Sequence, residues 1–422
     1  MSDPALDSSD EVQVSENEYK PSFLEKALRK LPISVFNRDK RPVKVSACKA
    51  QASSDFYSHF IEKKTYSDEY RSQVLDFCGQ QEPITFDKLF PKHKYRSIMR
   101  FDSGTYADVY KVRNPKDGKW IVLKIVRTVS KSLQKQLTSV SFSGTETFDD
   151  IFNELVISKA LSKLHHRSFS EPKYLAHCYP VLLDAKLVKG NLPDNFVRGE
   201  KCEDTEESPQ RNEPFSDYTG APIEFVVFIM KYGGEPIWKM IKEKRIDGAQ
   251  LLSISKQVTF GLAVAELCYE YEHRDLHISN ILVKKTKKPY IRFHVDGVFY
   301  DVETAGFRAC IVDHTFSRLK HRDTVYYKDM REILKSKKED KVTLQHQVYK
   351  WMINETNNEW NLFCPKTNLF WLYYLFSTLQ KSSLVREHPA VKKEFEQIAK
   401  QANNMKSTNE ILDFIVQLTD GN

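Results

Sequence analysis

Asp275 and Asn280 lie five residues apart in a short polar stretch between two apolar segments. Residues 251–271, before this stretch, are apolar and numerous enough to form a core helix, and residues 281–283 after it form a short predicted strand. A loop fixed at both ends can hold a carboxylate and an amide oxygen at one place. The carboxylate can accept a proton from a hydroxyl group, and the amide oxygen can bind a metal ion beside phosphates. The pattern therefore favours phosphoryl transfer over the alternative, an exposed polar loop beside a hairpin.

The length of the chain excludes a single small core. Its 422 residues suit a two-lobed unit of roughly 250–350 residues with an additional tail. Hydrophobic residues make up 41% of the chain and aromatic residues 12%, which is typical of a globular protein. The formal net charge of +7 permits an anionic partner, but a solvated surface accounts for it more simply.

The seven cysteines are widely spaced, odd in number and contain no C-x-x-C pair. This pattern predicts reduced thiols in a cytosolic or nuclear compartment, rather than a disulfide framework or a structural zinc site. The polar, acidic N-terminus has no signal-peptide pattern. No uninterrupted apolar run approaches the length that spans a membrane, so we expect no membrane partner.

Charge divides the N-terminal region into two parts. Residues 1–20 are acidic and polar and are predicted to be disordered. Residues 26–49 are rich in lysine and arginine, which is typical of a nuclear-import or nucleic-acid patch and equally of a solvated linker. The ordered part of the chain is predicted to begin between residues 65 and 87.

Alternating apolar residues predict a strand, a tight turn and a returning strand over residues 95–112. Gly104 lies in the turn, where backbone N–H groups can approach phosphates. Residues 120–126 form a predicted buried strand that contains one lysine, Lys124. Because burial of a lone ammonium group is unfavourable, Lys124 needs an anionic partner, unless it lies on an edge strand and points to water.

A helix predicted over residues 148–164 offers that partner. Glu154 lies close to the apolar face of this helix and is the best candidate, ahead of Asp149 and Asp150 at the helix start. The sequence therefore predicts an ion pair between the strand lysine and this helix.

The middle of the chain is predicted to contain two strands, an insertion between them and a hinge between the lobes. A further strand is expected over residues 176–187, followed by a mobile insertion over residues 189–221 that is rich in Gly, Pro, Asp, Glu and Ser. Residues 223–230 form a buried predicted strand that ends in Lys231, Tyr232 and a pair of glycines. A strand that breaks into two glycines suits a hinge between lobes.

The second half of the chain is predicted to be mainly helical. A hairpin is expected over residues 290–302, and a buried strand over residues 309–313 ends on the carboxylate of Asp313. Residues 320–341 contain more basic than acidic side chains. Further helices are expected at residues 343–354, 368–379, 389–403 and 409–418, with the aromatic residues at 370–376 in the core.

Residues 272–283 carry the H-R-D-x-x-x-x-N pattern of protein-kinase catalytic loops, and the stretch resembles the haspin family of atypical serine/threonine protein kinases. Asp313-His314-Thr315, followed by Ser317-Arg318-Leu319, is similar to the D-Y-T and S-R-L motifs that haspins carry instead of D-F-G. Further matches run from about residue 76 to the C-terminus and include residues 78–80, 154–159, 262–266 and 357–360.

The resemblance implies an α+β, two-lobed protein-kinase-like fold with a small β-rich N-lobe and a larger, mainly helical C-lobe. Residues 1–70 would be a disordered, basic extension, and residues 71–422 the haspin-like kinase domain. Within that domain, the N-lobe would occupy about residues 84–230 and the C-lobe about residues 235–422.

The resemblance also implies a role for each matching side chain. Asp275 would be the catalytic base, and Lys124, braced by Glu154, would hold the phosphates of ATP. Asn280 and Asp313 would bind Mg²⁺. The loop and hinge residues that would surround ATP are Gly104, Ala107, Val109, Met230, Lys231, Tyr232 and Gly233.

The implied activity is serine/threonine kinase activity toward a protein substrate, with a histone tail in mitosis as the family's example. Chromatin would then be a partner. The protein would be located in the nucleus, with chromosome association, and the cytoplasm is the alternative location. No direct nucleic-acid binding is expected from the kinase domain.

The sequence departs from the family pattern at three places. Of the three glycines expected in the turn, only Gly104 is present, which predicts weaker ATP binding. Gln347 stands where haspins have an aspartate. The preceding stretch, acidic in haspins, contains Lys335, Lys337, Lys338 and Lys341, so like charges would disfavour a basic peptide.

Two alternatives remain open at this level. Loss of the glycines and of the acidic stretch is also what a pseudokinase that serves as a binding module would show. Residues 275–280 are in addition similar to the D-L-H-x-x-N loop of aminoglycoside and choline kinases, which phosphorylate small molecules.

Overall fold

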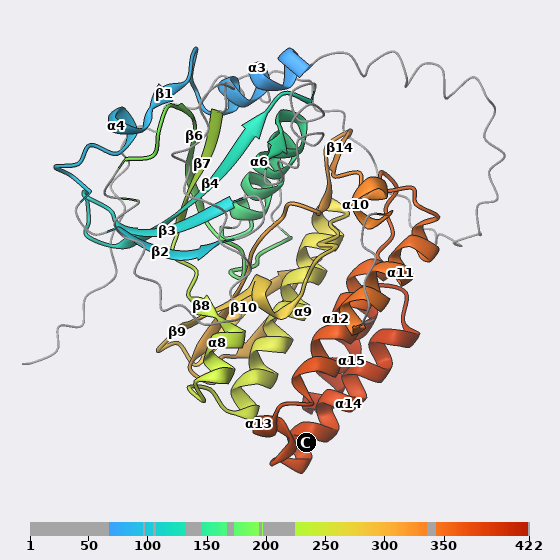
Figure 1. Ribbon diagram of the computed structural model, residues 1–422. Helices are drawn as coiled ribbons and strands as arrows, with labels where there is room; N and C mark the ends of the chain where they lie inside the picture. Colours follow the sequence, from blue (N-terminus) through green and yellow to red (C-terminus); the bar gives the residue numbers. More distant parts are fainter. Residues whose placement is uncertain are drawn as a thin grey trace, which may run out of the picture. The chain divides into compact units, whose positions relative to one another are not determined.

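The computed structural model describes residues 67–95, 98–103, 107–131, 145–166, 173–193, 196, 224–335 and 343–420. They belong to one unit that spans Lys64–Asn422. An N-terminal lobe built on one sheet is followed along the chain by a mainly helical C-terminal lobe (Figure 1). This arrangement confirms the α+β, two-lobed fold expected from the sequence.

The described part of the N-terminal lobe contains a sheet of seven strands. They are β1 (Ile84–Thr85), β2 (Ile98–Ser103), β3 (Ala107–Arg113), β4 (Trp120–Val129), β5 (Glu146–Thr147), β6 (Leu182–Lys189) and β7 (Glu224–Lys231). The order is β1-β6-β7-β4-β3-β2, with β5 paired to the end of β4. The pairs β1–β6 and β4–β5 are parallel, and the other pairs are antiparallel. Strand β4 is an interior strand, because it pairs with β3, β5 and β7.

The alternation of side chains along β4 decides where Lys124 points. Leu123 and Ile125 are buried in one core, on the face that holds Phe86 and Phe90 of the short helix α4 (Phe86–Leu89) and its end. Val126 is buried in a second core on the opposite face. Because successive side chains of a strand point to opposite faces, Lys124 shares the face of Val126.

Helix α6 (Phe148–Lys163) covers this second face together with α3 (Ser67–Phe77). The side chain of Thr147 accepts a hydrogen bond from the backbone N–H of Asp150, which caps the start of α6. Asp149 and Asp150 lie in the first turn and Lys163 in the last turn, where their charges favour the helix dipole. These signals fix the helix so that Glu154 lies above the strand lysine.

The connection between the lobes depends on Gly234. Strand β7 leads through Tyr232 into β8 (Glu235–Pro236), which pairs with β9 (Ile281–Lys285). Gly234 has a φ of +126°, and a Cβ atom there would lie 2.1 Å from the carbonyl oxygen of Val283. Only glycine allows the two backbones to come this close.

We expect Gly234→Ala to lower the melting temperature much more than Gly297→Ala. Gly297 also has a positive φ, +95°, but an added Cβ there meets nothing within 4 Å. The control variant therefore measures backbone strain alone, about 1–2 kcal/mol. Gly234→Ala adds a clash with backbone that must move. Calorimetric melting of both variants tests this, and equal melting temperatures would contradict the close approach.

Helix α9 (Gly248–Tyr269) is the central helix of the C-terminal lobe. Asp247 and Gln250 form a capping box at its start, each side chain accepting a hydrogen bond from the other residue's backbone N–H. By length and composition α9 alone among the described helices could cross a membrane, but 83% of its apolar window is buried inside the protein. Apolar residues all round are also what a buried core helix requires.

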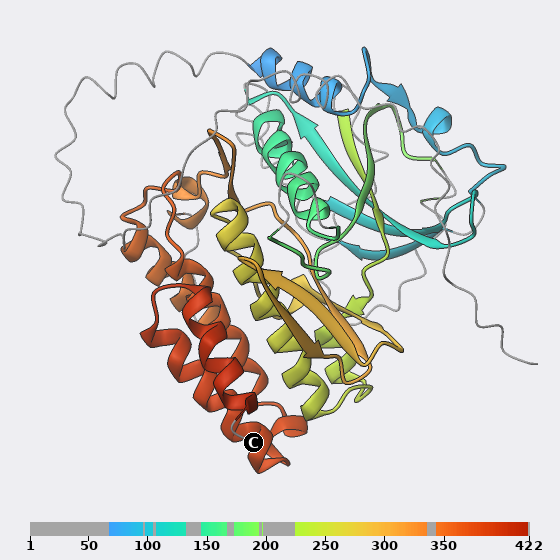
Figure 2. The same cartoon turned by 180° about the vertical axis from the view of Figure 1, so that it is seen from behind.

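The last helices of the chain pack side by side along α9, as the orange and red segments of Figures 1 and 2 show. The remaining C-lobe elements are α8 (Ile237–Lys242), η3 (Ile278–Asn280), β10 (Tyr290–Val295), β11 (Val298–Glu303), β12 (Phe307–Ile311), β13 (Arg318–His321), β14 (Thr324–Tyr327), α10 (Arg331–Lys335), α11 (Leu344–Thr356), α12 (Lys366–Leu379), α13 (Ser383–Arg386), α14 (Pro389–Asn404) and α15 (Thr408–Asp420).

Most predicted elements are confirmed, but some were wrong or missed. The hairpin at 290–302 and the four C-terminal helices are present with shifted ends. The strand predicted over 176–187 is wrong in its first half, because β6 begins at Leu182 and Pro180 has no N–H for a ladder. The sequence patterns did not predict α8, α13 or the β13–β14 hairpin, which are short and carry weak periodic signals.

Several expectations concern residues outside the described ranges. They are the acidic segment 1–20, the basic segment 26–49, the turn at Gly104, most of the insertion at 189–221 and residues 336–342 of the charged segment.

Candidate active site

The polar stretch around Asp275 forms a loop between α9 and β9. Its first end is held by backbone hydrogen bonds between Glu272 and Arg318 in both directions. At its second end, the Asn280 Nδ2 donates a 2.9 Å hydrogen bond to the backbone oxygen of Asp275. The loop thus closes on itself, and its hydrogen bond joins Asn280 at the second end to Asp275 in the middle of the loop.

The loop is stabilised by a buried ion pair between Arg274 and Glu272. Arg274 and Glu272 both have fully buried side chains, and Arg274 donates from Nη2 to Glu272 Oε1 at 3.0 Å and from Nε to Oε2 at 3.1 Å. Arg274 also donates to the carbonyl oxygen of Trp360 at 2.7 Å, and Glu272 accepts from the hydroxyl of Thr367 at 2.8 Å. Because both charges are fully hydrogen-bonded away from water, they fix the backbone next to Asp275.

Lys124 lies at the centre of a second network. Its Nζ donates to Glu154 Oε1 at 2.6 Å and to Asp313 Oδ1 at 3.0 Å, residues 30 and 189 positions away in the sequence. Glu154 comes from α6, and Asp313 follows β12 with a φ of +64°. The structure therefore joins the two lobes through the lysine that the sequence predicted to need an anionic partner.

Thr315 belongs to the same network, and sequence reasoning did not assign it a role. Its hydroxyl lies 2.7 Å from Asp313 Oδ1, 3.2 Å from Glu154 Oε2 and 3.3 Å from Lys124 Nζ. A single hydroxyl proton can serve only one of the two carboxylates. Its place in the D-x-T motif was the signal that could have identified it.

The charges of this network stabilise each other. Burial disfavours the charged form of Lys124, but the carboxylates of Asp313 and Glu154 outweigh burial, so the pKa of Lys124 is raised. Partial burial likewise disfavours ionised Asp313, but Lys124 and the hydroxyl of Thr315 outweigh it and lower the pKa of Asp313. Lysine and aspartate therefore both stay charged at neutral pH.

The residues predicted to surround a nucleotide lie on the strands next to Lys124 and at the hinge. Val109 on β3 lies directly opposite Lys124 in the β3–β4 ladder, and Ala107 lies two residues before it. Gly104 falls outside the described residues.

Met230 and Lys231 end strand β7, where they pair with β4, and Tyr232 and Gly233 follow in the hinge. A Cβ atom on Gly233 would lie 2.9 Å from the Sγ of Cys310, so the hinge passes close to β12.

A model of the family described as "Haspin like kinase domain" matches residues 24–414 of the chain. The chain belongs to this family. It is 28% identical to the serine/threonine-protein kinase haspin homolog of Drosophila melanogaster, over 74% of this chain and 53% of that protein. It is 29% identical to Mus musculus serine/threonine-protein kinase haspin over 72% of this chain and 38% of that protein. The Arabidopsis thaliana haspin homolog is 26% identical, over 79% and 51% respectively. The chain spans about half or less of the length of these curated relatives.

The donor atoms of the haspin-like domain fit a magnesium ion that is held together with a nucleotide. Both hydrogen bonds found for the Asn280 side chain use Nδ2, so Oδ1 can face a cation. Asp313 keeps 42% of its side chain exposed. Mg²⁺ takes hard oxygen donors, usually one or two from the protein, with phosphates and water as the others. No cluster of three or more His, Cys, Asp or Glu side chains that could hold a metal by itself occurs among the described residues.

Tyr349 is a further residue that sequence reasoning missed. Its hydroxyl donates a 2.5 Å hydrogen bond to Asp275 Oδ1, although the two residues are 74 positions apart. Tyr349 lies on α11, which was predicted as a helix, but no local pattern indicates what its side chain contacts.

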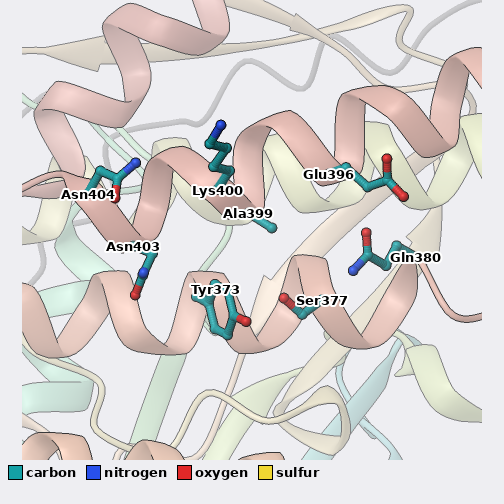
Figure 3. Close-up of a pocket in the computed structure, with 8 residues that line it drawn as sticks. All are labelled: Tyr373, Ser377, Gln380, Glu396, Ala399, Lys400, Asn403 and Asn404. Atoms are coloured by element: carbon teal, nitrogen blue, oxygen red, sulfur yellow. The ribbon is translucent and has the colours of Figure 1, made fainter.

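Two cavities in the described part of the chain contain none of the predicted site residues. One of them, about 420 Å³, lies between α12 and α14 (Figure 3), and polar side chains such as Gln380 and Asn403 line it. The second, about 380 Å³, lies at the end of α9 beside β13. The candidate active site of this haspin-like domain is therefore argued from side-chain geometry and not from these two cavities.

The stability of the domain is expected to fall on acidification. Burial, the largest cause in each case, lowers the pKa of four histidines from 6.5 to about 4 and raises that of two glutamates from 4.5 to about 7: His165, His177, His273, His321, Glu146 and Glu266. Between pH 6.5 and 4, unfolded histidines bind protons that the folded ones do not, so unfolding is favoured. The glutamates act oppositely between pH 7 and 4.5, because they bind protons first in the folded state.

Since the histidines outnumber the glutamates, we expect the melting temperature to decrease from pH 6.5 to 4.5. Each net proton taken up on unfolding corresponds to about 1.4 kcal/mol of unfolding free energy per pH unit. Thermal melts in buffers of matched ionic strength measure the slope. A melting temperature that rises on acidification would show that the glutamates dominate.

Proposed function

We propose that this chain is an active serine/threonine protein kinase that transfers the γ-phosphate of ATP to a hydroxyl group of a protein. The observation that carries the proposal is the position of Lys124, hydrogen-bonded at once to Glu154 and Asp313. Phosphoryl transfer requires a cation that neutralises phosphate oxygens, a carboxylate that accepts a proton and oxygen ligands for a metal ion. The ammonium group held by both lobes, together with the carboxylate and the amide oxygen of the rigid loop, can supply them.

Each side chain then has one task in the reaction. Lys124 neutralises phosphate oxygens of ATP, and the backbone of the hinge at Lys231 and Tyr232 meets the adenine. Asp275 accepts the proton of the substrate hydroxyl while the oxygen of that hydroxyl bonds to the γ-phosphorus. The bond from that phosphorus to the β–γ bridging oxygen breaks, and ADP leaves. Asp313 and Asn280 would hold Mg²⁺, which neutralises charge on the phosphates when bound.

The proposed substrate is a histone tail, phosphorylated on chromatin in the nucleus during mitosis. What supports this choice is membership of the haspin-like family. The exposed Gln347 on α11 argues for a changed preference, because the resemblance expects an aspartate there. A substrate-binding surface with less negative charge would bind a basic tail less tightly and would tolerate an acidic peptide.

The decisive experiment measures transfer of radiolabelled phosphate from ATP by the purified full chain. The acceptors are histone-tail peptides, a set of acidic peptides and a set of small alcohols, and the control is Asp313→Ala. Transfer to a histone tail that disappears in the control supports both activity and substrate. Transfer only to acidic peptides would keep the activity and reject the histone tail.

Two outcomes of the same assay would reject the protein-kinase proposal. Phosphorylation of small alcohols without phosphorylation of peptides would favour a small-molecule phosphotransferase. Binding of ATP without transfer to any acceptor would favour a pseudokinase that acts as a binding module.

A further inference from the structure

The hydroxyl of Tyr349 contacts the carboxylate to which the proposed reaction assigns the role of base. It donates to Asp275 Oδ1 at 2.5 Å, and the Tyr349 residue is only 5% exposed. The other carboxylate oxygen, Oδ2, lies 3.7 Å from His277 Nε2. The two oxygens of Asp275 therefore have different surroundings, one toward α11 and one toward the catalytic loop.

The position of the Tyr349 hydroxyl is fixed by packing within the C-lobe. Its ring meets the fully buried ring of Trp371 on α12 edge to face, with centroids 5.4 Å apart. The indole nitrogen of Trp371 in turn contacts the sulfur of Met352, also on α11, at 3.2 Å. A capping box between Thr343 and His346 fixes the start of α11. The donor is thus carried by a rigid helix.

The phenol is a suitable donor because it carries no charge. Burial, and then the negative charge of Asp275, raise the pKa of Tyr349, so the hydroxyl stays protonated throughout the physiological range. A lysine at this place would neutralise the carboxylate and weaken it as a base. A neutral hydroxyl orients the carboxylate without neutralising its negative charge.

We propose that Tyr349 is a positioning residue for phosphate transfer, and that its hydroxyl fixes Asp275 through Oδ1 so that Oδ2 meets the substrate hydroxyl. This inference rests on the proposed kinase function. It predicts that Tyr349 affects the rate of transfer only through the carboxylate of Asp275. Misplacement of a reacting group by about 1 Å can cost on the order of 100-fold in rate.

The test compares Tyr349→Phe with Tyr373→Phe, a control on α12 whose ring contacts Trp351 and not the catalytic loop. Rates are expressed per nucleotide-binding site, titrated with a fluorescent ATP analogue, so that any unfolded fraction is excluded. We expect kcat for peptide phosphorylation to fall about 10- to 100-fold in Tyr349→Phe. The KM for ATP should stay within about twofold, and the control should equal the unmodified chain.

A double-variant cycle separates positioning from a general structural effect. In the Asp275→Asn background, where the base is absent, Tyr349→Phe should change the remaining single-turnover rate by less than about twofold. An unchanged kcat in Tyr349→Phe would overturn the inference, as would an equal fractional loss in both backgrounds. Absence of transfer by the unmodified chain would instead reject the kinase proposal itself, so the two failures are distinguishable.

Discussion

Asp275→Asn is expected to reduce kcat for peptide phosphorylation by about 10²- to 10⁴-fold, the usual contribution of a general base. The amide has nearly the same shape as the carboxylate and can still accept the hydrogen bond from Tyr349, but it cannot take a proton. Nucleotide binding should be retained, because the contacts of Lys124 with Glu154 and Asp313 do not involve Asp275. Phosphate transfer and ATP affinity, measured on the same preparation, test this expectation.

The matched control is Asp296→Asn. Asp296 lies in the β10–β11 turn with a φ of +43°, which asparagine tolerates, and its side chain is 61% exposed. Its activity and melting temperature should equal those of the unmodified chain. If Asp275→Asn kept full activity with normal melting, the proton would be taken by another group, and the assignment of the base would be wrong.

Arg274→Leu is expected to lower the free energy of unfolding by about 3–5 kcal/mol, because it leaves the carboxylate of Glu272 buried without its main partner. Neither side chain has any exposed surface, and the pair is held by two hydrogen bonds of about 3 Å. Arg318, at 3.8 Å, compensates only in part. Denaturation in guanidinium chloride, followed by tryptophan fluorescence, measures the loss.

The double variant Glu272→Met, Arg274→Leu tests the physical reason for this loss. If the cost comes from an unpaired buried charge, removing both charges should cost less than the sum of the two single changes. Arg292→Leu is the control, since the Arg292–Asp301 pair has the same geometry but lies exposed on a hairpin. It should leave stability nearly unchanged. Additive single effects would show that Glu272 and Arg274 act independently.

Local sequence patterns determined a large part of this protein. Glu154 lies on a helix because α6 has apolar residues at helical spacing, a capping residue and an acidic first turn. Lys124 lies among buried neighbours because apolar residues surround it on β4. The spacing of Asp275 and Asn280 sets a closed loop whose hydrogen bond joins residues five apart. In each case the signal and the structure involve residues close in sequence, so the pattern predicts the element directly.

Only the tertiary structure decided which distant side chains meet. Nothing near Tyr349 indicates a contact with Asp275. The D-x-T motif places Thr315 beside Asp313, but nothing near Thr315 indicates that its hydroxyl also reaches Glu154, 161 residues away. The burial of Arg274 and Glu272 likewise depends on the segment at 360–367, about 90 residues later, which supplies the remaining partners. The sequence determined the elements and the candidate chemistry, because those follow from periodicity and local spacing. The packing of the two lobes and of α11 against the catalytic loop determined the geometry of the site, because a contact between distant residues leaves no periodic signal in either segment.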